Sequence, residues 1–153
     1  MSSVILFFII IVIFVCMSLV LNRIYSMRIK VYKDIKFLIT IFIQEIGFKK
    51  ISFNECLFNN KDKISAYSYK VIFSYLDLGA RCHLFSKDDF LEIYNYIDSV
   101  SLGDVEYAIS LNKYHLSLID NKLNEYITLY KSNGVLYIKL IIVFGILLAV
   151  IVL

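Results

Sequence analysis

A charge-free apolar run near the N-terminus constrains this chain more than any other feature of its sequence. The run covers the eighteen residues from Val4 to Leu21. A helix needs roughly 20 apolar residues to cross about 30 Å of hydrocarbon, so this run is close to the required length. A cleaved signal peptide fits less well, because no basic segment precedes the run and no small-residue cleavage pattern follows it. The run therefore predicts a membrane-spanning helix over residues 4–21.

A second apolar run lies at the other end of the chain. Leu140 to Leu153 contains no charged or amide side chain. Extending the run back to Val135 gives nineteen residues, with Lys139 placed where its long side chain can reach water and Tyr137 at the membrane interface. Hydrophobic residues make up 59% of the 153-residue chain and their excess lies at its two ends, so we expect a second membrane span over residues 135–153.

The charges beside the two spans predict their orientation. The positive-inside rule places a basic connecting segment in the cytoplasm, so the central segment, residues 22–134, is predicted to be cytoplasmic. The same cations would attract anionic lipid headgroups. Three cysteines without a regular spacing agree with a reducing compartment. The basic residues next to the spans are Arg23, Arg28, Lys30, Lys33, Lys36, Lys131 and Lys139, against the single acid Asp34.

The central segment is predicted to be all-α. Apolar residues continue out of the first span at helical spacing as far as Gly47, which is expected to stop that helix. Ser52 to Glu55 has the form of a capping box for a short helix, and two further helices are predicted over residues 64–78 and from residue 87. The fold class predicted is a small cytoplasmic helical bundle between an N-terminal and a C-terminal transmembrane helix.

A long final helix is predicted from Asp104 to the end of the chain. Its apolar stripe in the cytoplasmic part is expected to be buried, with Asn112 as a polar member, whereas Lys113 falls off the stripe. Leu116 is central to that stripe. The apolar members are Val105, Ile109, Leu116, Ile119, Leu123, Tyr126 and Tyr130.

No sequence motif for catalysis or cofactor binding is found. A phosphate-binding glycine loop, a metal-spaced cluster and a nucleophile elbow are all missing from the sequence. Cys82 and His83 could form a reactive or zinc-binding pair, but two loop residues are the favoured interpretation. From Phe37 to Gly134, ten Lys and Arg stand against twelve Asp and Glu, which gives nucleic acid no electrostatic support. We therefore expect no enzyme activity, cofactor, metal or nucleic-acid partner.

Several short motifs follow one another along the chain in an order that resembles a known family. Its later members include Leu102-Gly103 with Glu106, a Lys131 to Asn133 stretch, and a closing apolar run from Gly145. With the two-span arrangement, this order resembles stage III sporulation protein AB of endospore-forming bacteria over nearly the whole chain. The chain differs from the family pattern at Ser110 and Ile141, where that family tends to have Gln and Gly respectively. The earlier motifs are Glu45-Ile46, Leu78-Gly79 and Asp88-Asp89-Phe90.

The resemblance implies a platform subunit on the mother-cell side of the forespore envelope, with a domain like that of type II secretion and type IV pilus platform proteins. Its expected partners are a cytoplasmic ATPase of the stage III sporulation protein AA type and other membrane components of the channel. Glu45, Asp104 and Glu106 are the predicted docking acids for a basic partner, although capping or ending a helix would also explain them. Two alternative functions stay open: a generic two-span structural or holin-like protein, and an enzyme with a dispersed site. Homo-oligomerisation stays open as well.

Overall fold

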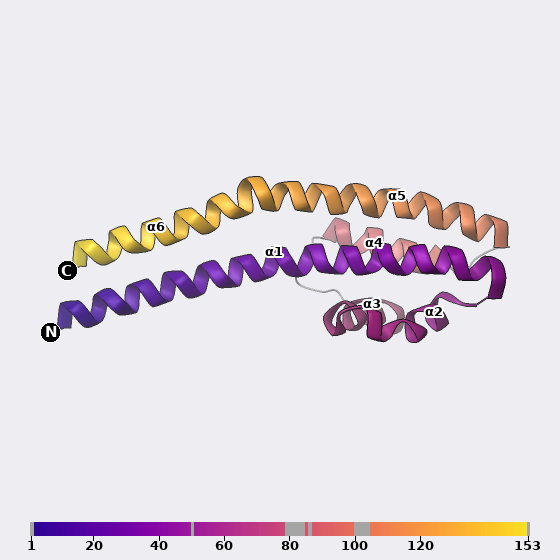
Figure 1. Cartoon of the computed structure of the whole chain (residues 1–153), viewed down its shortest axis with the longest axis horizontal. Coiled ribbons are helices and arrows are strands. Elements are labelled where there is room, and N and C mark those ends of the chain that lie inside the picture. The colour runs from indigo at the N-terminus through magenta and orange to yellow at the C-terminus, as the bar shows by residue number, and fades with distance from the viewer. Residues whose placement is uncertain (1, 50, 79–84, 86, 100–104, 153) are drawn as a thin grey trace. The chain divides into compact units, whose positions relative to one another are not determined.

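The structure, a computed structural model, describes residues 2–49, 51–78, 85, 87–99 and 105–152 (Figure 1). Within these ranges every regular element is a helix and none is a strand, which confirms the all-α prediction. The chain divides into two compact units. One combines Met1–Met27 with Glu125–Leu153, and the other is Arg28–Asn124.

The first unit contains the apolar ends of the chain. Helix α1 (Ser2–Lys49) contributes its part up to Met27, and the C-terminal side contributes the end of α5 (Val105–Leu129) and α6 (Val135–Val152). A π-helical turn, Tyr130–Gly134, joins α5 to α6. The sequence predicted one uninterrupted helix there and did not reveal the change of helix type. By length and composition, the described residues contain two helices able to cross a membrane.

Small residues on α6 allow α1 to pack closely against it in the first unit. Gly145 is buried, and a β-carbon added there would lie 2.5 Å from Cβ of Phe14. Ala149, four residues later on the same face, is fully buried. Membrane helices approach each other through such small residues, since lipid supplies no hydrophobic force to drive them together. This packing explains why α6 carries Gly and Ala within an otherwise bulky apolar run.

The second unit is a bundle built around the later half of α1. It adds α2 (Phe53–Asn59), a 3₁₀ turn (Lys61–Lys63), α3 (Ala66–Leu78), α4 (Lys87–Ser99) and α5 as far as Asn124. The predicted apolar series of α1 is confirmed, because all of its members from Val31 onward are buried. These are Val31, Ile35, Leu38, Phe42 and Ile46.

Two helix ends test the sequence signals directly. The Ser52 hydroxyl accepts a hydrogen bond from the backbone N–H of Glu55 at 3.2 Å, so the predicted N-cap of α2 is confirmed. Gly47, in contrast, does not end α1, which continues to Lys49. Nothing lies within 4 Å of a β-carbon added at Gly47, so no tertiary packing there requires a glycine.

The buried face of α5 differs in detail from the predicted stripe. Asn112 is fully buried and Lys113 is exposed, as expected, but Leu116 is only half-buried. Val105 and Ile109 are also half-buried. The buried face of α5 is therefore rotated slightly about the helix axis from the predicted stripe. Its buried members are Ala108, Asn112, Ile119 and Leu123.

Candidate functional site

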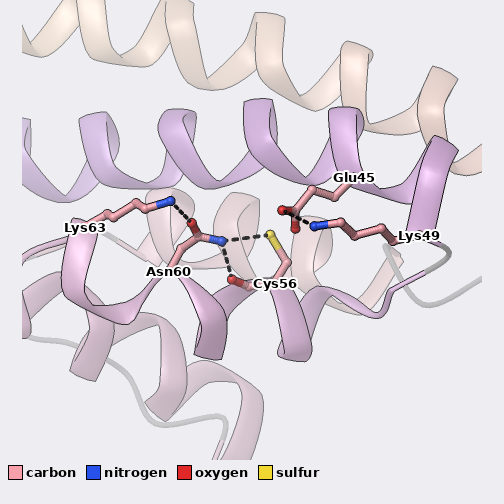
Figure 2. A network of polar contacts seen from close by, with 5 residues as sticks. All are labelled: Glu45, Lys49, Cys56, Asn60 and Lys63. Carbon is pink, nitrogen blue, oxygen red and sulfur yellow. Dashed lines mark hydrogen bonds and ion pairs between the residues drawn. The ribbon is translucent and has the colours of Figure 1, made fainter.

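A cluster of polar side chains lies where the last turn of α1 approaches α2 and the turn after it (Figure 2). The Glu45 carboxylate forms an ion pair with Lys49, with Nζ and Oε1 separated by 3.4 Å. The Asn60 side-chain amide donates to the backbone carbonyl of Cys56 at 2.9 Å, and Lys63 Nζ donates to Asn60 Oδ1 at 3.0 Å. Asn60 is thereby held at the C-terminal end of α2, where it caps the helix.

The Cys56 thiol is buried and stays protonated at neutral pH. Its burial, reinforced by the negative charge of Glu45, raises the pKa from 9.0 to about 11, while Asn60 and Lys63 act weakly in the opposite direction. The thiolate is the nucleophilic and metal-binding form of cysteine, so this environment makes Cys56 a poor nucleophile and a poor ligand. The cluster therefore does not activate its thiol.

Glu45 is the one predicted docking acid that belongs to this cluster. Its Oε2 atom is buried and has no hydrogen-bond partner among the described residues, while Oε1 faces the exposed Lys49. A buried carboxylate oxygen without a donor is costly to the fold. Because Oε2 is buried, Oε1, which is paired with Lys49, is the oxygen through which Glu45 would contact a cationic partner.

Glu106 lies in the first turn of α5 and is exposed, next to Tyr107, which is 54% exposed. An ion pair between Lys36 and Asp120 connects α1 to α5, and these helices run antiparallel (Figure 1). The last turn of α1 and the first turn of α5 consequently lie at the same end of the second unit. Asp104, the third predicted docking acid, lies outside the described residues.

The other side chains considered for chemistry are Cys82, His83 and His115. Cys82 and His83 also lie outside the described residues, and the described part of the chain holds no group of three or more potential metal-ligating side chains. His115 is half-buried, and burial lowers the pKa of its imidazole. Its ring lies 5.1 Å from the ring of Tyr96, centroid to centroid, so it packs within the bundle as an interface residue.

Sequence reasoning missed the buried polar partners of this bundle. The hydroxyl of Tyr32 donates to Asp89 at 3.3 Å, and that of Tyr96 donates to Asn112 at 2.8 Å. The presence of Asn112 in an apolar stripe was the only sequence signal for either pair.

Comparison with known proteins adds no assignment, because no family model, curated protein or solved structure matches the chain.

Proposed function

We propose that this chain is a non-enzymatic membrane platform subunit that docks a cytoplasmic ATPase to a transenvelope complex, as its resemblance to the sporulation family implies. The observation that supports the proposal is the continuity of α1 over 48 residues. Its first half is apolar and largely exposed, as a lipid-facing helix would be, and its second half forms the core of a helical bundle. A helix shared by a membrane anchor and a bundle links the two parts without any chemistry of its own.

The proposed docking surface is the end of the bundle that carries Glu45 and Glu106. Exposed aromatic side chains accompany these acids, with Phe48 92% exposed and Tyr107 54% exposed. Interfaces between proteins are enriched in aromatic residues, and complementary charge steers the partner into register. A basic surface on the ATPase is the partner that this combination of acids and aromatics suits.

Binding of an ATPase to the full-length chain in lipid nanodiscs tests the proposal. With a purified ATPase of the stage III sporulation protein AA type, Glu106→Lys should weaken binding about tenfold, equivalent to about 1.4 kcal/mol. Asp62→Lys is the matched control, because Asp62 is also exposed but lies in the 3₁₀ turn. No binding by the parent protein would instead favour the two-span structural or holin-like alternative.

A further inference from the structure

An apolar groove runs along α1 in the first unit. Its volume is about 500 Å³, within the usual range for a site that holds one small molecule. Val12, Met17 and Val20 are each more than half exposed, so the groove is accessible from outside the protein. Its walls are aliphatic or sulfur-containing side chains, chiefly Val12, Cys16, Met17, Val20 and Ile24 of α1 and Ile141 of α6.

The groove has the length of one membrane leaflet. From Val12 to Ile24 a helix rises about 18 Å, and half of the hydrocarbon core is about 15 Å thick. Val12 lies near the middle of the apolar run 4–21. If α1 crosses a membrane as proposed, the groove starts near the bilayer centre and ends at the interface that carries the basic residues.

The interfacial end of the groove is polar and cationic. Arg23 is exposed and follows Val20 by three residues, which puts it on the same side of the helix. At this level the Tyr130 hydroxyl donates to Asn22 Oδ1 at 2.7 Å, and the Tyr25 and Tyr130 rings lie 5.8 Å apart. Tyrosines are typical of the membrane interface, so the two helices are joined where lipid headgroups would lie.

We propose that this groove binds one acyl chain of an anionic phospholipid, with the lipid phosphate at Arg23. A guanidinium group binds a phosphate through paired hydrogen bonds, and the aliphatic walls supply the apolar contact. A second copy of the chain suits the groove less well. In a parallel pair, two Arg23 side chains would face each other, and the groove walls lack the Gly and Ala that allow helices to approach closely.

Native mass spectrometry of the full-length protein with equal amounts of phosphatidylglycerol and phosphatidylcholine tests this site. The parent should retain phosphatidylglycerol, and Val20→Trp, which fills the groove, should reduce the retained lipid by about fivefold or more. Leu19→Trp is the matched control, because Leu19 and Val20 are 60% and 59% exposed but only Val20 lines the groove. Arg23→Gln should keep a bound lipid and lose the preference for the anionic headgroup.

Equal lipid retention by Val20→Trp and Leu19→Trp would contradict the proposed lipid site. Efficient oxidative cross-linking of Cys16 to Cys16 in membranes would overturn it as well, since a second copy would then occupy the groove. Measuring ATPase binding distinguishes failure of the lipid proposal from failure of the proposed platform function. If the groove binds no lipid but the protein still binds the ATPase, only the lipid proposal is wrong. Failure of the chain to enter membranes would remove both.

Discussion

The Tyr96 hydroxyl donates a 2.8 Å hydrogen bond to Asn112 Oδ1, linking α4 to α5 between two side chains that are 1% and 0% exposed. The Asn112 amide group in turn donates to the backbone carbonyl of Ala108 at 2.7 Å. Both ends of the Asn112 side chain are therefore satisfied inside the bundle. Burial also raises the pKa of Tyr96 well above 10.0, so the hydroxyl remains a donor at neutral pH.

Tyr96→Phe should destabilise the protein by about 1–3 kcal/mol, because the substitution leaves the buried Asn112 oxygen without its donor. Tyr114→Phe removes a hydroxyl from an exposed tyrosine on α5 and should change stability by less than about 0.5 kcal/mol. Denaturant titration followed by circular dichroism would measure both values. Equal effects of the two substitutions would show that the buried bond contributes nothing.

Ile119→Asp should destabilise the bundle more than Leu116→Asp, and both more than Lys113→Asp. Ile119 is 1% exposed, so its loss removes about 2 kcal/mol of apolar burial and also forces a carboxylate out of water. Leu116 is half-buried and Lys113 is exposed. Thermal unfolding of the three variants gives the ranking, and Lys113→Asp as the most damaging change would mean that α5 is rotated from the described orientation.

Gly145→Ala should loosen the packing of α6 on α1, because the new methyl group would lie 2.5 Å from Cβ of Phe14 and the backbones must separate. Gly47→Ala is the control. It meets open space in α1 and should be neutral or stabilising by up to about 1 kcal/mol, since alanine favours a helix over glycine. Melting temperatures in detergent compare the two variants, and a more stable Gly145→Ala protein would contradict close helix contact.

Stability should fall as the pH rises from about 9 to about 11, in part because of Cys56. The folded-state pKa of this thiol is raised to about 11, so the unfolded chain loses the proton first and unfolding becomes easier in this window. Below pH 9 the contribution is fully present. Cys56→Ala should flatten the pH dependence of the free energy of unfolding, as denaturant titrations at several pH values would measure.

Both chain termini should face away from the cytoplasm if the basic residues next to the spans set the orientation. In a cysteine-free background, an impermeant maleimide added to intact cells should label a cysteine placed at Ser3 and not one placed at Asn54. Both positions are exposed, so burial does not account for the difference. The opposite labelling pattern would invert the topology.

Local sequence patterns were enough to predict the helical class of this protein and most of its helix boundaries. Three-and-four spacing of apolar residues, the Ser52 cap and the two charge-free runs all act within a few turns of one helix, so each can be recognised without knowing the fold. A glycine is a weaker signal. Gly47 lowers helix propensity by only about 1 kcal/mol relative to alanine, and α1 continues past it to Lys49.

Contacts between helices were decided by the tertiary structure alone. Pairing Asn112 with Tyr96, or Gly145 with Phe14, depends on the rotation and axial register of two helices, and periodicity within either one does not specify these. The same holds for the raised pKa of Cys56, which results from burial and from Glu45, a residue on another helix. Such effects arise only when groups distant in sequence come together away from water, where charge and unmet hydrogen bonds cost most.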